Sequence, residues 1–236
     1  MLARHALRMN IAGKITHRLV ELEGKFLYLL IALLSVFVVY PFFQGSPMAT
    51  IVLDILLLAM LVAGIYTVFD KKILLAIALL LAIPMFGGRW SNYFYTHPVL
   101  LEIDYGFGAM FFLFNAITIS SYVLQQKNVT HNLIFGAVCG YLLIGMSWAF
   151  TYSLVAFLEP GSFSIVAAGQ TSQGDVLPHF FYYSFVTLTT LGYGDITPVG
   201  PFARSLSTLE AIVGQIYLTV LVARLVGVHI SQSYAK

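Results

Sequence analysis

The chain has 236 residues, of which 59% are hydrophobic and only 9% are charged. A soluble globular protein carries about a quarter charged residues, so these polar side chains are too few to cover a soluble fold, and we expect lipid to solvate the chain. The net charge of +2 is too small to indicate a nucleic-acid partner. The single cysteine excludes an intrachain disulfide framework.

Residues 1–25 combine basic and apolar side chains at helical spacing. The two sets are Arg4, Arg8, Lys14 and Arg18, and Leu7, Ile11, Ile15, Leu19 and Leu22. This pattern predicts a cytoplasmic amphipathic helix that lies on the inner leaflet and binds anionic lipid. A frayed basic tail that only sets topology is the alternative. The segment does not resemble a cleavable signal, because no short apolar core with a small-residue cleavage site precedes Phe26.

Six apolar segments are candidates to cross the membrane. They are Phe26–Phe43, Ala49–Phe69, Ile73–Phe86, Ile103–Leu124, Asn132–Leu158 and Pro201–Ile230. The third is shorter than the roughly 20 residues that a spanning helix needs, because Pro84, Gly87 and Gly88 are expected to end it.

The basic residues outside these segments predict the orientation of the chain. They precede the first segment, lie between the second and third as Lys71 and Lys72, and lie between the fourth and fifth as Lys127. The alternate loops hold almost nothing basic except Arg89. The positive-inside rule therefore places both termini in the cytoplasm, as a multi-pass protein of the plasma membrane.

Residues 159–177 are mostly small and polar, which predicts an extracellular loop, and Pro178 then suits the first turn of a short helix up to Thr189. The stretch that follows holds Gly192 and Gly194 at alternate positions. Glycine tolerates the left-handed conformation, and alternating handedness turns successive carbonyl groups the same way. Such a row of oxygens can replace the hydration shell of K⁺.

The predicted K⁺ ligands follow one another along this stretch. They are the backbone oxygens of Thr190, Leu191, Gly192 and Tyr193, with the Thr190 hydroxyl at the inner end. Gly194 completes the alternation, and Asp195 places a carboxylate at the outer mouth. A tight Gly-Tyr-Gly-Asp hairpin is the alternative, but it does not explain the threonines at 187, 189 and 190 or the position between two apolar segments.

The nine residues Thr187–Asp195, with Ile196–Pro198, resemble the signature of the tetrameric potassium channels, and the resemblance extends over about residues 131–230. It implies an all-α membrane protein of six transmembrane helices, with a re-entrant pore helix and filter between the fifth and sixth. It also implies a homotetramer that conducts K⁺ passively and is not an enzyme, with K⁺ in the filter and no organic cofactor.

Residues around the filter are expected to support it. The pore helix carries the paired aromatics Tyr182 and Tyr183, and the latter stands where the family often has tryptophan and is expected to reach Asp195. Thr189 closes the pore helix. Leu191 departs from the family's usual valine or isoleucine. Glu210 is predicted to hydrogen-bond the pore helix, through Ser184 or a tyrosine, whereas a titrating gate is the alternative.

The last segment is predicted to line the cavity and gate the pore. Gly214 matches the family's hinge glycine, although close packing against the pore helix explains it equally well. At helical spacing, the cavity face is predicted to comprise Gln215, Leu218, Thr219, Val222 and Val226. A ring of four Val226 side chains is expected to close the pore by dewetting.

The chain thus divides into the basic segment 1–25, a four-helix domain over 26–124 and a pore domain over 125–236. The four-helix domain resembles a voltage sensor only in the number and position of its helices, because its fourth segment has no Lys or Arg. We expect at most weak voltage dependence. Asp54 in the second segment has no obvious partner. The alternatives are a non-conducting subunit or scaffold that pairs with another channel, and an ion-coupled transporter, which would need repeated pore loops.

Overall fold

The computed structural model describes residues 24–43, 46, 48–94, 97–126, 128–165 and 176–234. The first helix runs over Gly24–Phe42 and ends in the 3-10 turn η1, Tyr40–Phe42. The elements that follow are α2 (Ala49–Val68), α3 (Lys72–Ser91), α4 (Pro98–Gln125), α5 (His131–Leu158), β1 (Phe163–Ile165), α6 (Leu177–Leu188), β2 (Ile196–Pro198) and α7 (Pro201–Tyr234). The predicted amphipathic helix over 1–25 lies almost entirely outside the described residues.

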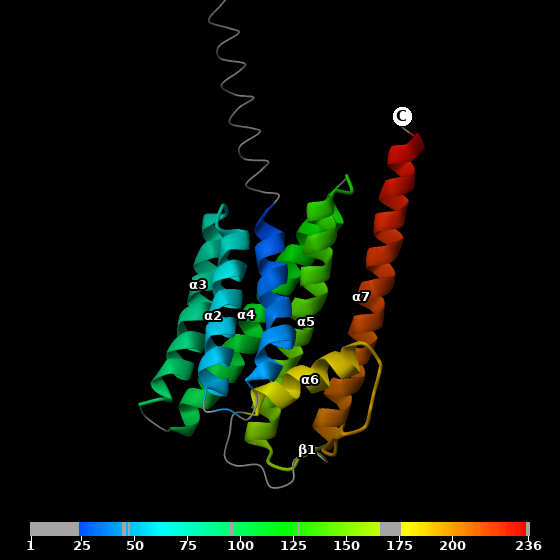
Figure 1. Ribbon diagram of the computed structural model, residues 1–236. Helices are drawn as coiled ribbons and strands as arrows, with labels where there is room; N and C mark the ends of the chain where they lie inside the picture. The colour runs from blue at the N-terminus through cyan, green and yellow to red at the C-terminus, as the bar shows by residue number, and fades with distance from the viewer. Residues whose placement is uncertain are drawn as a thin grey trace, which may run out of the picture.

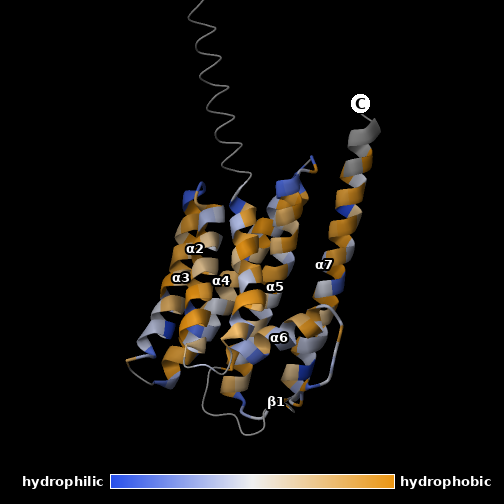
Figure 2. Ribbon diagram, viewed as in Figure 1, coloured by the Kyte–Doolittle hydropathy of each residue, from blue (hydrophilic) through white to orange (hydrophobic). Residues whose placement is uncertain are grey.

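Within this part of the chain, six helices are long and apolar enough to cross a membrane, which confirms the six predicted spans. Apolar residues cover most of their length, and polar residues gather near their ends (Figure 2). A helix of 20 residues is about 30 Å long, which matches the hydrocarbon thickness of a bilayer. The six spans include the third, which the sequence made doubtful.

The predicted end of the third span at Phe86 is wrong, because α3 continues to Ser91 with Pro84 inside it. In hydrocarbon, no water can hydrogen-bond the polar groups of a non-helical backbone. Continuing the helix past Pro84, with one N–H missing, therefore costs less than ending it there. Gly88 does not end the helix either. A Cβ on Gly88 would lie 2.8 Å from the Leu100 carbonyl oxygen, so its lack of a side chain lets α3 and α4 approach closely.

The first helix, α2, α3 and α4 stand side by side, α5 packs on α4, and α7 stands beyond α5 (Figure 1). The short helix α6 lies across one end of the molecule, between α5 and α7. Aromatic side chains connect these layers: Phe112 of α4 lies 5.3 Å from Phe150 of α5, which lies 6.0 Å from Phe181 of α6, measured between ring centroids. The four-helix domain and α6 therefore share one apolar core.

A two-stranded antiparallel sheet departs from the all-α prediction. Strand β1 pairs with β2, with Phe163 opposite Pro198 and Ile165 opposite Ile196. No sequence pattern indicated the sheet, because three residues are too few to show the alternation of a strand. Strand β1 lies between α5 and α6 in the chain and β2 lies between α6 and α7, so the sheet joins the two connections.

Candidate functional site

The predicted ion-binding stretch connects α6 to β2, and we call Thr190–Gly194 the filter strand. Gly192 and Gly194 have φ values of 60° and 82°, which confirms their predicted left-handed conformation. Thr190 also has a positive φ, of 59°, whereas Leu191 and Tyr193 do not. The backbone therefore alternates in handedness over five residues. Alternate handedness is the condition for successive carbonyl groups to point the same way.

Hydrogen bonds hold the inner end of the filter strand against α6. The backbone N–H groups of Leu191 and Gly192 both donate to the Val186 carbonyl, at 2.9 and 3.3 Å. Among the described residues, no group donates to the carbonyl oxygens of the filter strand. Thr189 donates its hydroxyl to the Phe185 carbonyl at 2.6 Å and so belongs to the end of α6. The first three residues of the strand thus donate their N–H groups to carbonyls of α6, and the carbonyl oxygens of the strand remain available.

The outer end of the filter strand is fastened to α6 through tyrosines. Tyr182 hydrogen-bonds the Asp195 carboxylate, and its ring stacks on Tyr193 with a centroid separation of 6.5 Å. The carboxylate raises the pKa of the Tyr182 hydroxyl to about 12, so the hydroxyl remains a donor at neutral pH. The prediction that Tyr183 reaches Asp195 is wrong, because its hydroxyl pairs with Ser207 of α7 at 2.6 Å. Successive helix residues point about 100° apart, so Tyr182 faces the filter strand and Tyr183 faces α7.

Glu210 of α7 is fully buried, and both of its carboxylate oxygens accept a hydrogen bond. The Ser184 hydroxyl donates at 2.5 Å and the Tyr152 hydroxyl at 2.6 Å. The predicted contact with Ser184 of the pore helix is confirmed. The tyrosine comes from α5 rather than α6, so Glu210 ties all three helices behind the filter strand together.

Gly214 of α7 lies against the end of α6. A Cβ at this position would come within 2.4 Å of the Leu188 carbonyl oxygen, which the Tyr141 hydroxyl also approaches, at 3.2 Å. The structure therefore contains the close packing that was one of the two explanations for this glycine. The helix α7 runs without interruption from Pro201 to Tyr234. The hinge remains a prediction.

The predicted cavity residues lie along α7, on a surface that one chain leaves open. Gln215, Thr219, Leu218, Val222 and Val226 are all exposed. The Gln215 amide lies 3.5 Å from the Thr190 hydroxyl, so the inner end of the filter strand borders this surface. Leu191 and Tyr193 are also exposed, at 56% and 67%. The filter strand and the cavity face thus form one continuous exposed region in the single chain.

A cluster of charged and polar side chains lies in the four-helix domain, far from the filter strand in the sequence. Arg89 is buried, and it donates from Nε to Asp54 and from Nη1 to Asp104 at 3.1 Å. Tyr93 also donates to Asp54. We call these four residues the ion-pair cluster. It corrects two expectations: Arg89 lies in α3 rather than in a loop, and Asp54 has partners.

Comparison with known proteins finds matches for the region around the filter strand. Residues 133–230, which include most of α5, all of α6 and most of α7, match the family model described as "Ion channel". The inward rectifier potassium channel Kirbac3.1 of Paramagnetospirillum magnetotacticum is 33% identical over 86 residues. That alignment covers 33% of this chain and 29% of the relative, so the chain spans less than a third of the relative's length. No solved structure matches the chain.

Proposed function

We propose that this multi-pass membrane protein is a K⁺-selective channel with a pore-loop domain, because residues 133–230 match the ion-channel family model and 86 residues are 33% identical to a potassium channel. The observation that carries the proposal is the alternating handedness at Thr190, Gly192 and Gly194. Carbonyl oxygens of Thr190, Leu191, Gly192 and Tyr193 replace the water around K⁺, and the Thr190 hydroxyl adds an oxygen at the inner end. No bond is made or broken, so the chain acts without catalysis.

Four copies of the chain surround the conduction path. One filter strand supplies oxygens to only one side of an ion, so closed four-fold symmetry completes each site. The open surface of the filter strand and α7 supports this assembly. Its apolar side chains, such as Leu191, Leu218 and Val222, are exposed in the single chain, and the assembly of four chains would enclose this surface.

In the proposed pore, α6 enters the membrane from the outside and ends at Leu188, directly before the filter strand. The C-terminal end of a helix carries a partial negative charge, which stabilises a cation in the cavity below the filter. The cavity face of α7 becomes apolar toward Val222 and Val226. There it forms the gate, which closes when the ring of valines excludes water.

We place both termini in the cytoplasm and the filter strand near the outer face of the plasma membrane. Voltage dependence is at most weak, because α4 contains no Lys or Arg. The arginine of the ion-pair cluster lies in α3 and is held between two carboxylates. The four-helix domain therefore offers the membrane potential little free positive charge to move.

Potassium flux out of liposomes that contain the purified chain tests this function. Vesicles loaded with K⁺ and diluted into Na⁺ develop a negative internal potential only if K⁺ leaves selectively, and a potential-sensitive dye reports it. We expect the signal with the unmodified chain, together with a cross-linked species of four subunits. Vesicles that release K⁺ and take up Na⁺ equally fast would refute selectivity, and tightly sealed vesicles would refute conduction.

A further inference from the structure

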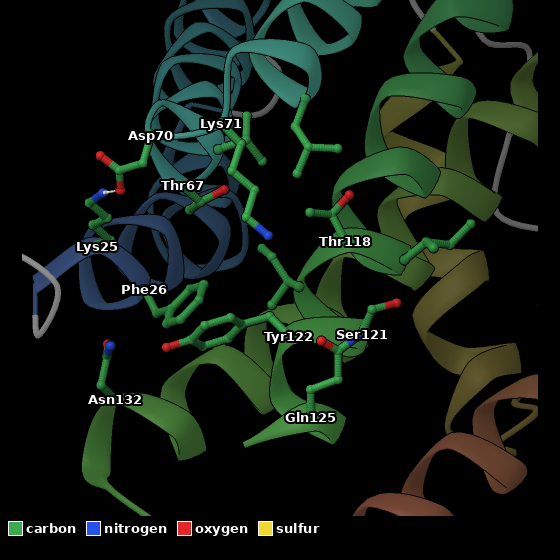
Figure 3. Close-up of a pocket in the computed structure, with 14 residues that line it drawn as sticks. Lys25, Phe26, Thr67, Asp70, Lys71, Thr118, Ser121, Tyr122, Gln125 and Asn132 are labelled. Carbon is green, nitrogen blue, oxygen red and sulfur yellow. Dashed lines mark hydrogen bonds and ion pairs between the residues drawn. The ribbon is translucent and has the colours of Figure 1, made fainter. Parts of the chain in front are cut away.

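A cavity with polar and apolar lining residues opens in the four-helix domain at the end of the molecule where α7 also ends (Figure 1). Its volume is about 450 Å³, and residues of the first helix, α2, α3, α4 and α5 and of the α2–α3 connection line it (Figure 3). This volume falls in the usual range for small-molecule sites. The orientation under "Proposed function" places the cavity at the inner leaflet, and the inference rests on that orientation.

Lysine and hydroxyl side chains line this cavity. The Lys71 side chain points into it, toward Thr118 and Tyr122 (Figure 3). Among the described residues, neither the Lys71 amine nor the hydroxyls of Thr118, Ser121 and Tyr122 have a hydrogen-bond or ion-pair partner. An ammonium group at a membrane boundary is stabilised by an anion or by water. Among the described lining residues, the cavity therefore presents the free cation of Lys71 to a ligand, with the hydroxyl-bearing residues Thr118 and Tyr122 beside it (Figure 3).

The other charges in the lining leave Lys71 available. Lys25 is buried and pairs with Asp70, which is the one acid among the described residues that line the cavity (Figure 3). Lys25 and Asp70 compensate each other, so the net charge of the lining is that of Lys71. A phosphate group complements this arrangement, because its oxygens accept hydrogen bonds from both ammonium and hydroxyl groups.

Apolar residues extend the cavity toward the lipid-facing surface. Phe26, Val68 and Leu74 line it beside the polar groups, and Ile117 of α4, also in the lining, is 58% exposed. A soluble phosphate would leave this wall uncovered, whereas an acyl chain would bury it at about 25 cal/mol per Å². We propose that the cavity binds the phosphate headgroup of an anionic membrane lipid, with Lys71 as its principal contact.

Such a lipid would also lie close to helices of the pore. Asn132 in the first turn of α5 lines the cavity. Two hydrogen bonds join α7 to residues near the start of α5. Tyr217 donates to the Ala137 carbonyl of α5 at 2.7 Å, and Arg224 donates to the carbonyl of Gln126, at the end of α4, at 3.2 Å. The bound lipid therefore stabilises the position of α5 that the inner half of α7 packs against.

Native mass spectrometry of the purified full chain in detergent, titrated with dioleoyl phosphatidylglycerol, tests the binding. Lys71→Gln should weaken lipid binding about tenfold, as expected for one charge-assisted hydrogen bond. Lys72→Gln is the matched control, because Lys72 is adjacent and exposed but does not line the cavity, and it should change binding less than about twofold. Thr118→Val, which keeps the shape, should weaken binding about threefold.

Three results would overturn the proposal. Equal losses for Lys71→Gln and Lys72→Gln would mean that the surface attracts anionic lipid without a site. Equal binding of phosphatidylcholine would mean that the anionic charge is not recognised. Displacement of the lipid by the same concentration of free glycerol phosphate would mean that the cavity takes a soluble phosphate. The measurement uses no ion flux, so its outcome is independent of whether the chain conducts.

Discussion

The filter strand and the ion-pair cluster use polar groups in opposite ways. The filter strand leaves its carbonyl oxygens without donors and holds its shape by left-handed residues and by bonds to Val186. The ion-pair cluster buries Arg89 between Asp54 and Asp104 and adds Tyr93 as a further donor. In the proposed channel, the carbonyl oxygens of the filter strand bind an ion that enters and leaves, whereas the charges of the ion-pair cluster compensate each other and stabilise the four-helix domain. We therefore expect backbone handedness to control conduction and charge pairing to control stability.

The largest effect is expected from a Cβ in the filter strand. Gly192→Ala should abolish the K⁺ current or its selectivity, because the left-handed conformation then costs about 1–2 kcal/mol in each chain. No other atom lies within 4 Å of that Cβ position, so the effect comes from the backbone and not from a clash. Current from reconstituted protein measures it.

Gly87→Ala is the matched control, because its Cβ also meets nothing and the residue lies inside the helix α3. It should leave current and selectivity unchanged. A Gly192→Ala channel that still selects K⁺ would show that the handedness at residue 192 does not determine selectivity.

The second-largest effect is expected from removing the buried cation Arg89, which should lower the free energy of unfolding. Arg89→Met leaves the fully buried Asp104 carboxylate without its cation, which costs about 3 kcal/mol in free energy of unfolding. Chemical unfolding in detergent, followed by circular dichroism, measures the change. Arg89→Met combined with Asp104→Asn should recover part of the loss, because the uncompensated charge is gone. Unchanged stability in the single variant would contradict the role of the ion-pair cluster.

A moderate effect is expected at the proposed gate. Val226→Asp should hydrate the ring of four side chains and raise the open probability several-fold, whereas Val226→Leu keeps the ring apolar and should not. Single-channel recording gives the open probability. Cysteines at Val222 and Val226 that react equally fast with an aqueous thiol reagent in closed and open channels would place the gate elsewhere.

The smallest effect is expected from the membrane potential. One elementary charge that crosses the whole field gains about 2.3 kcal/mol per 100 mV, or about 4.6 kcal/mol between −100 and +100 mV. Without Lys or Arg in α4, and with Arg89 held by two acids, open probability should change only shallowly over this range. Steep activation equivalent to several charges per tetramer would mean that the moving charges lie outside α4.

The sequence was sufficient for the filter strand because its glycines specify the backbone directly. Gly192 and Gly194 have the predicted handedness, but Thr190 was not expected to share it, since its residue type does not favour a positive φ. Its conformation follows from the hydrogen bonds that hold the next two residues against Val186. These bonds are local and close the C-terminal end of α6, where the residue after the C-cap is commonly left-handed, but glycine is the residue type that usually marks that position.

The ion-pair cluster could not be predicted for a different reason. Asp54, Arg89 and Asp104 belong to three helices, and only the packing of α2, α3 and α4 brings them together. Proline and glycine rules taken from water-soluble helices ended the third span too early and left Arg89 in a loop. In lipid the helix continued, because its backbone had no other hydrogen-bond partners.

Single-channel recording from the reconstituted chain, with K⁺ on one side of the bilayer and Na⁺ on the other, tests the central claim most directly. The proposed filter predicts a reversal potential displaced far toward the K⁺ equilibrium potential, because Na⁺ does not replace its hydration shell with the oxygens of Thr190, Leu191, Gly192 and Tyr193. A reversal potential near zero would mean equal permeability to both ions and would contradict the assignment of the filter strand.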